Sequence, residues 1–211
     1  MLVLCLGGRR VTAVNLDTVV SEKTRINLED PVAASKIAGD LVKRMKKCGV
    51  TADTSKVLLC IGTDRSTGDC LGPLVGSKIG LTQQNFFAVY GTLDRPVHAS
   101  NLKETMESIK TLYKDPFIIA IDACLGRLES VGCIHLGDGS ILPGAGVNKD
   151  LPPVGQIHIT GIVNVGGYME YIILQNTRLN LVMRLADIIV GGINKAICEF
   201  AQENAGEHIQ M

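Results

Sequence analysis

Two aspartates stand where a folded sheet would bring them together. Asp69 lies in the polar loop that follows the apolar run 57–61, and Asp122 directly follows the apolar run 117–121. Both runs are typical of short strands buried on both faces. The carboxyl ends of parallel strands meet at one edge of a sheet, where open α/β folds bind their ligands. We therefore expect both carboxylates to project into one crevice.

A pair of carboxylates in one crevice is suited to acid–base catalysis. Both groups cannot easily ionise at close range, so one pKa rises, the other falls, and the pair titrates as a unit. One member can then hold a proton while the other activates water, as in hydrolysis by paired aspartates. The alternative is that Asp69 and Asp122 only cap the helices that follow them. Spacing alone does not separate these interpretations, and Asp64 on the same loop is a weaker candidate.

Other chemistries fit the same loops less well. A phosphate-binding P-loop needs lysine after its second glycine, where this loop carries Asp69. Cys70 or Cys124 could act as a nucleophile or share a metal with an aspartate. The base for such a thiol would have to be His135 or His158, which lie in predicted strands where a core or surface role is favoured. We expect no nucleotide, no metal and no other cofactor.

The residues around the aspartates are candidates for substrate binding. In the first loop these candidates are Thr63, Asp64, Arg65, Ser66, Thr67 and Gly68. The glycine-rich segment 143–149 is a second polar loop, in which Gly144, Gly146 and Asn148 are the candidates. This segment could form a wall of the crevice, with backbone N–H groups or the Asn148 amide available to a developing oxyanion. An ordinary turn is the alternative for it.

The composition indicates a folded protein without a charge bias. Of 211 residues, 46% are apolar and 20% charged, with 21 basic residues against 21 acidic ones. This balance gives no reason to expect nucleic acid or anionic lipid as a partner. Seven cysteines form no C-x-x-C pair, and free buried thiols in a reducing cytoplasm are the plain interpretation. No apolar run approaches the ~20 residues that span a bilayer, so we expect a cytoplasmic protein and no membrane partner.

Strands and helices alternate along the chain. Helices are predicted over residues 31–47, 71–80, 101–112 and 177–203, with Asn101 as an N-cap. Strands are predicted over residues 57–61, 86–90, 117–121, 131–136 and 156–163, the last as an edge or half-buried strand. Gly191 and Gly192 indicate a kink or a close helix–sheet contact. The alternation predicts an α/β fold, a three-layer α/β/α sandwich with a mostly parallel sheet. We expect residues 1–30 to be an extension or hairpin and 31–211 a single domain.

Residues 60–73 (CIGTDRSTGDCLGP) closely resemble the signature of the YyaC-type sporulation proteins of spore-forming Firmicutes. More distantly, the chain resembles the spore germination protease, whose two proposed catalytic aspartates match Asp69 and Asp122. Residues 143–147 (PGAGV) are similar to a Pro-Gly-Ser-Gly-Val loop of that protease. The resemblance extends to the phosphorylase/hydrolase-like fold of the hydrogenase-maturation proteases. In that third group two matching acidic residues and a histidine bind a metal, and no histidine of this chain aligns with the third ligand.

The resemblance implies a sporulation-related peptidase. It implies Asp69 and Asp122 as the catalytic pair and small acid-soluble spore proteins as the substrate class, in the cytoplasm of the sporulating cell or forespore. Two alternatives stay open: a non-catalytic sporulation factor that uses the fold as a binding scaffold, and a metal-dependent maturation-type protease. A protein or peptide substrate is the expected partner, and homo-oligomer formation is left open.

Overall fold

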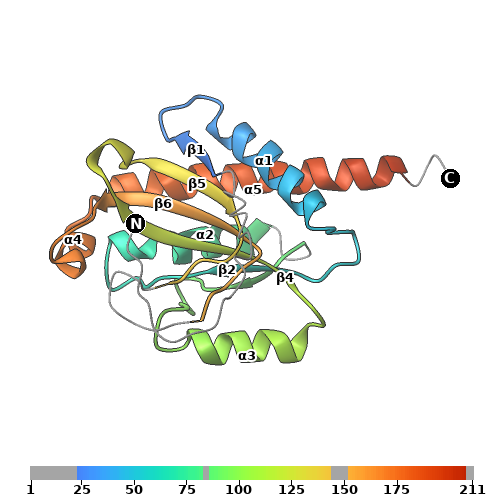
Figure 1. The fold of residues 1–211 in the computed structure, drawn as a ribbon, viewed down its shortest axis with the longest axis horizontal. Helices are drawn as coiled ribbons and strands as arrows, with labels where there is room; N and C mark the ends of the chain where they lie inside the picture. Colours follow the sequence, from blue (N-terminus) through green and yellow to red (C-terminus); the bar gives the residue numbers. More distant parts are fainter. Residues whose placement is uncertain (1–22, 83–85, 144–151, 208–211) are drawn as a thin grey trace, which may run out of the picture.

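The computed structural model describes residues 23–82, 86–143 and 152–207 (Figure 1). The described strands are β1 (Thr24–Asn27), β2 (Lys56–Cys60), β3 (Ala88–Tyr90), β4 (Phe117–Gly126), β5 (Cys133–Asp138) and β6 (Ile157–Val165). The described α-helices are α1 (Ala33–Lys47), α2 (Leu71–Thr82), α3 (Leu102–Leu112), α4 (Glu170–Gln175) and α5 (Leu179–Glu207). Two 3₁₀ turns, η1 (Gly68–Cys70) and η2 (Leu128–Ser130), complete the described elements.

The strands form a single mixed sheet in the order β1-β5-β6-β4-β2-β3. The pairs β2–β3, β2–β4 and β4–β6 are parallel, which confirms the expected α/β fold. The pairs β1–β5 and β5–β6 are antiparallel, so the mostly parallel arrangement is matched only roughly. The central parallel strands are short apolar runs because both of their faces are covered.

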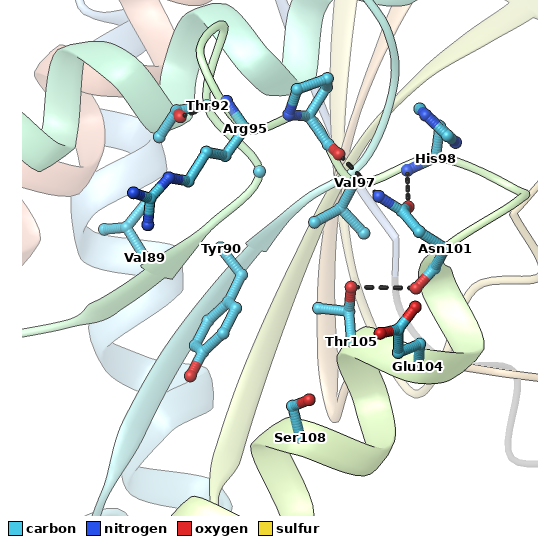
Figure 2. A pocket seen from close by; sticks show the side chains of 12 residues that line it. Val89, Tyr90, Thr92, Arg95, Val97, His98, Asn101, Glu104, Thr105 and Ser108 are labelled. Carbon is cyan, nitrogen blue, oxygen red and sulfur yellow. Dashed lines mark hydrogen bonds between the residues drawn. The ribbon is translucent and has the colours of Figure 1, made fainter.

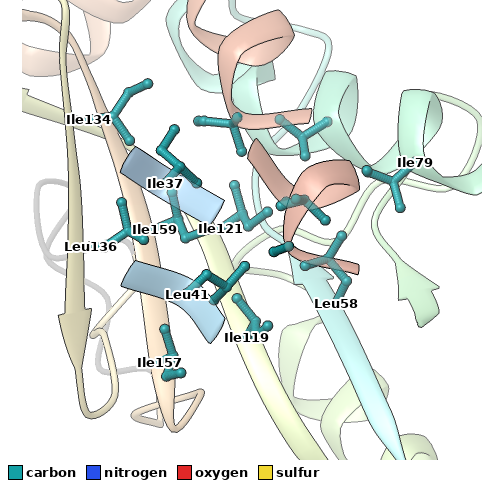
Figure 3. Close-up of a cluster of buried hydrophobic side chains, with 14 of the residues drawn as sticks. Ile37, Leu41, Leu58, Ile79, Ile119, Ile121, Ile134, Leu136, Ile157 and Ile159 are labelled. Atoms are coloured by element: carbon teal, nitrogen blue, oxygen red, sulfur yellow. The ribbon is translucent and has the colours of Figure 1, made fainter. Parts of the chain in front are cut away.

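Three helices cover one face of the sheet. Buried side chains of α1, α2 and α5 pack with the strands in one large cluster (Figure 3). Ile37 and Leu41 on α1 meet Ile119 and Ile121 on β4, and none of the four side chains is accessible to solvent. Burying side chains of this size contributes about 1.5–3 kcal/mol each. This cluster is the main source of the stability that holds the strand ends in place.

Among the described helices, α3 alone covers the opposite face, together with Val97 and Val154 from the connecting segments (Figure 1). Leu102 and Ile109 of α3 pack on Val57 and Leu59 of β2 in a second, smaller cluster. The result is a three-layer sandwich, as predicted, with one thick helical layer and one thin layer. Asn101 holds the N-cap position of α3, but its side chain makes no capping bond to the helix.

The glycine pair in α5 has a packing role. A Cβ atom at Gly192 would collide with the side chain of Ile37, and one at Gly191 would lie 3.5 Å from Ala34 Cβ. Gly192 therefore lets α5 approach α1 closely, whereas a side chain at Gly191 would make only an ordinary contact. The close contact expected here is real, but its partner is a helix and not the sheet.

Some predicted elements need correction. The segment predicted as an edge or half-buried strand, β6, lies inside the sheet between β5 and β4, and residues 157–163 are buried. The short helix α4 was not predicted. Residues 24–27, assigned to the N-terminal segment, pair with β5 as β1. The hairpin considered for residues 2–16 lies outside the described residues, and the division into domains stays a prediction. None of the described helices is long and apolar enough to cross a membrane.

Candidate active site

The loop that carries Asp69 is fixed by glycines at close backbone approaches. Gly62 directly follows β2 and its bridge residue Ile61, and has φ +139°, a conformation that other residues rarely adopt. A Cβ atom at Gly62 would collide with the carbonyl of Asp69, and one at Gly72 with the carbonyl of Ile61. The loop therefore folds back over the end of β2 before α2 begins. This position at the carboxyl end of a parallel strand is the one predicted for Asp69.

Asp69 lies half-buried in η1. Its backbone N–H donates to the Ser66 carbonyl at 3.0 Å, and its carbonyl accepts from the Thr63 N–H at 3.1 Å. Burial raises the pKa of the Asp69 carboxyl to about 6, although a hydrogen bond from the Thr63 backbone opposes the rise. The carboxyl is therefore ionised at neutral pH and takes up a proton in mildly acidic solution.

Asp122 lies within β4 and not beyond its end, because β4 continues to Gly126 alongside β6. Its Oδ1 accepts a hydrogen bond from the Ala123 N–H at 2.8 Å. Burial raises the pKa of Asp122 well above its ordinary value, and the charge of Asp69 raises it further. The charge of Asp69 therefore acts on the ionisation of Asp122. The expectation that one pKa would rise and the other fall was wrong, because burial raises both.

A polar row crosses the sheet from Asp122. Thr160 of β6 pairs in register with Asp122 on one side and with His135 of β5 on the other. The Nε2 atom of His135 is buried and has no hydrogen-bond partner among the described residues. Polar and apolar residues alternate in 156–163, which places Thr160 on the same face of its strand as other polar residues. That this face also holds Asp122 follows only from the pairing of β6 with β4.

The cysteines near the aspartates are poorly suited to act as nucleophiles. Burial, with a smaller contribution from Asp122, raises the pKa of the Cys124 thiol to about 12, opposed by a hydrogen bond with Thr160. Burial also raises the pKa of the Cys70 thiol, whose Sγ donates to the Thr67 carbonyl at 3.0 Å. A thiol with a raised pKa is largely protonated at neutral pH, and the thiolate is the reactive form.

The predicted substrate-binding residues of the first loop have different environments. Asp64 and Arg65 are exposed, while Thr63 and Thr67 are half-buried. Ser66 is buried, and its Oγ has no hydrogen-bond partner among the described residues. Gly68 is buried too. The remaining candidates, Gly144, Gly146 and Asn148, lie outside the described residues, and the roles assigned to all these residues stay predictions.

Residues from the end of β6 and from the α4–α5 turn support the Asp69 loop. A Cβ atom at Gly68 would lie 2.8 Å from Thr177 Oγ1 and from Leu174 Cδ2, so the loop packs directly on this turn. The Asn164 side chain donates to Thr177 Oγ1 at 3.2 Å, and the Thr177 hydroxyl donates to the Ile173 carbonyl at 2.9 Å. These residues carry no local signal in the sequence, because their contacts with Gly68 depend on α4, which was not predicted.

A metal ion does not fit the donor set that the structure describes. Within residues 23–82, 86–143 and 152–207, no three His, Cys, Asp or Glu side chains form a group that could hold one. Within the same residues, Asp69 and Asp122 supply oxygen ligands, but no third such side chain joins them. We therefore derive no catalytic step through a metal.

Comparison with known proteins decides the family. Residues 25–192 match the model of a family described as "Protein of unknown function (DUF1256)". The chain belongs to this family. It is 54% identical over 172 residues to "Uncharacterized protein YyaC" of Bacillus subtilis (strain 168), a match that spans 82% of each chain. The resemblance to YyaC-type proteins inferred from residues 60–73 is thus confirmed.

A more distant similarity reaches a protease. Over 132 residues the chain is 28% identical to "Germination protease" of Oceanobacillus iheyensis, a match that covers 56% of this chain and 36% of that protein. The match therefore spans about a third of that longer protein.

Proposed function

We propose that this DUF1256 protein is a sporulation-related peptidase in which Asp69 and Asp122 act as an acid–base pair on water. One observation carries the proposal: two carboxyl groups, one in η1 after β2 and one within β4, both have a raised pKa, and the charge of Asp69 raises the pKa of Asp122. Enzymes that use paired carboxylates place them in this way, so that one is ionised and one protonated. The similarity to a germination protease over 132 residues supports a proteolytic role.

The unequal pKa values assign the two roles. Asp69, with a pKa of about 6, is the ionised member at neutral pH and acts as the general base. It takes a proton from water while the water oxygen attacks the carbonyl carbon of the peptide bond. Asp122 keeps its proton because it is more deeply desolvated and lies near the Asp69 charge. It donates this proton to the leaving nitrogen as the C–N bond breaks, so each carboxyl exchanges one proton per turnover.

Small acid-soluble spore proteins are the substrate class that we propose. The argument comes from the family resemblance and from the protease name of the distant relative. The first loop supplies exposed Asp64 and Arg65 beside the carboxyl pair, where a polar polypeptide could bind.

Cleavage of a purified small acid-soluble spore protein, followed by intact mass, tests the proposal. We expect discrete fragments from the wild type, and a loss of rate of about 10²- to 10⁴-fold in Asp69→Asn and in Asp122→Asn. The control is Asp64→Asn, which removes an exposed carboxylate from the same loop and should keep most of the activity. An Asp69→Asn protein that cleaves as fast as the wild type would contradict the mechanism.

A binding scaffold is the second candidate, and one surface favours it. Three large side chains in α4 or just before it are exposed: Tyr168 by 86%, Met169 by 58% and Tyr171 by 63%. The other end of α4 packs on Gly68 of the Asp69 loop through Leu174. Neighbouring exposed apolar side chains often mark an interaction site. A scaffold would bind its partner equally well with Asp69→Asn, whereas Tyr171→Ser would weaken binding. If the protein is a peptidase, Asp69→Asn lowers its activity more than Tyr171→Ser does.

A further inference from the structure

A pocket of about 710 Å³ opens between β3 and α3 (Figure 2). Its walls are the end of β3 with Tyr90, the loop that returns to the sheet with Arg95 and Val97, and one side of α3 with Glu104 and Ser108. A cavity of this size can hold several residues of a peptide. Neither Asp69 nor Asp122 lines it.

The pocket follows the strand at one edge of the described sheet. β3 is the last strand in the sheet order, and within the described part of the chain it pairs only with β2. Val89 and Tyr90 of this strand line the pocket. An edge strand presents unpaired N–H and C=O groups, to which an extended peptide can add as a further strand.

Two opposite charges reach the pocket from different elements. Arg95 comes from the return loop and Glu104 from the first turn of α3 (Figure 2). Neither side chain has a hydrogen-bond or ion-pair partner within the described residues. The polar groups around Asn101 are already used, since Asn101 Oδ1 accepts from the His98 N–H at 2.8 Å and the Thr105 hydroxyl donates to the Asn101 carbonyl at 3.0 Å. The guanidinium is therefore the strongest donor left for a ligand, and its fork matches a carboxylate.

The pocket is joined to the aspartate pair through one stretch of backbone. Val97 bridges Ile61, and its carbonyl accepts a hydrogen bond from the Gly62 N–H at 2.8 Å. Gly62 leads into the loop that holds Asp69. Asp122 also faces the α3 side of the sheet, because it is two residues from Ala120, which packs in the α3 cluster. The pocket and Asp122 thus lie on one face of the sheet, on either side of β2, and Gly62 at the end of β2 leads from the pocket to Asp69.

We propose that this pocket binds an extended segment of the polypeptide substrate along the outer edge of β3, with an acidic substrate side chain paired to Arg95. The same segment places a basic side chain opposite Glu104. This inference rests on the proposed peptidase function, because the bound segment is a part of the substrate at a distance from the peptide bond that is cleaved.

Selection from a peptide pool tests the pocket without requiring cleavage. The probe is a synthetic pool of twelve-residue peptides with randomised positions, captured on immobilised Asp69→Asn protein and identified by mass spectrometry. We expect enrichment of Asp or Glu over Lys or Arg at one position, by roughly tenfold for a pairing worth about 1.4 kcal/mol. In the double variant that adds Arg95→Glu, the preference at that position should reverse.

The matched control is Lys103→Glu, the same reversal of charge at an exposed position of α3 that does not line the pocket. It should leave the selected sequences unchanged. The proposal is overturned if the pool shows no acidic preference, or if Arg95→Glu and Lys103→Glu alter the pool equally. Thermal unfolding of each variant confirms that the exposed Arg95 can be replaced without loss of the fold.

The outcomes separate this inference from the proposed function. If the wild type cuts no spore protein but the Arg95-dependent preference is present, the peptidase proposal fails and the pocket stands as a peptide site. If the wild type cuts its substrate and the preference does not depend on Arg95, only the pocket proposal fails.

Discussion

The two faces of strands β4 and β6 show how this chain separates stability from chemistry. On the face covered by α1, α2 and α5, the fully buried side chains are Ile119, Ile121, Ile157 and Ile159. Alternate residues on the opposite face are Ala120, Asp122, His158 and Thr160. Successive side chains of a strand point to opposite faces, so a core and a polar row are made from the same two segments.

The difference between the faces lies in how completely helices cover them. The first face is closed by three helices, and its apolar side chains exclude water. The second is covered by α3 over β2, while the polar row over β4, β6 and β5 is only half-buried in places. Partial burial raises the pKa of a carboxyl group without removing it from a ligand. The thinly covered face is therefore where Asp122 can combine a raised pKa with access to a ligand.

The largest effect on stability should come from the closed face. We expect Ile121→Ala to lower the free energy of unfolding by about 2–5 kcal/mol, because it leaves a cavity in a close-packed cluster. Urea unfolding of wild type and variant, monitored by circular dichroism, measures this difference in the free energy of unfolding.

The neighbouring residue on the other face provides the comparison. Asp122→Asn keeps the size of the side chain and its acceptor for the Ala123 N–H, and it removes the cost of burying a carboxyl group whose pKa is raised in the folded protein, so we expect no loss of stability at pH 7. If Asp122→Asn lowers the free energy of unfolding as much as Ile121→Ala does, the polar row also stabilises the fold, and the two faces do not separate stability from chemistry.

A smaller effect is expected in the pH dependence of stability. The pKa of Asp69 is about 6 in the folded protein, above its ordinary value of 3.8. Between these values the folded protein binds more protons than the unfolded chain, so the contribution of Asp69 to stability falls as pH rises through this window. Asp69→Asn removes the cost of ionisation. We expect the variant to be more stable than the wild type at pH 7 by roughly 1–2 kcal/mol, with little difference at pH 4.

Urea unfolding of both proteins at several pH values between 4 and 7 makes this measurement. Asp64→Asn serves as the control, because Asp64 is exposed on the same loop. A difference between wild type and Asp69→Asn that stays constant with pH would mean that Asp69 ionises as an ordinary surface carboxylate.

The sequence predicted much of the fold because the buried strands are short apolar runs. The runs at 57–61 and 117–121 became β2 and β4, and the helical periodicities became α1, α2, α3 and α5. β6 was misassigned because its alternating polar residues suggested contact with solvent. In the structure His158 and Thr160 are 7% exposed and face a polar interior row.

The candidate site was predictable only in part. Asp69 and Asp122 were identified because each follows an apolar run, and their meeting depends only on two parallel neighbouring strands. Thr160 was not identified, because its place beside Asp122 depends on the pairing of β6 with β4. The order of strands in a sheet cannot be deduced from local sequence patterns. The supporting turn at Thr177 was missed for a similar reason, since its contact with Gly68 is made between segments far apart in the chain.

The most direct test of the central claim is a titration of the two carboxyl groups by carbon-13 NMR, with assignments from Asp69→Asn and Asp122→Asn. The account predicts that Asp69 titrates near pH 6, that Asp122 stays protonated to higher pH, and that Asp69→Asn lowers the pKa of Asp122. Two carboxyl groups that titrate at ordinary values, each unaffected by replacement of the other, would contradict a coupled pair.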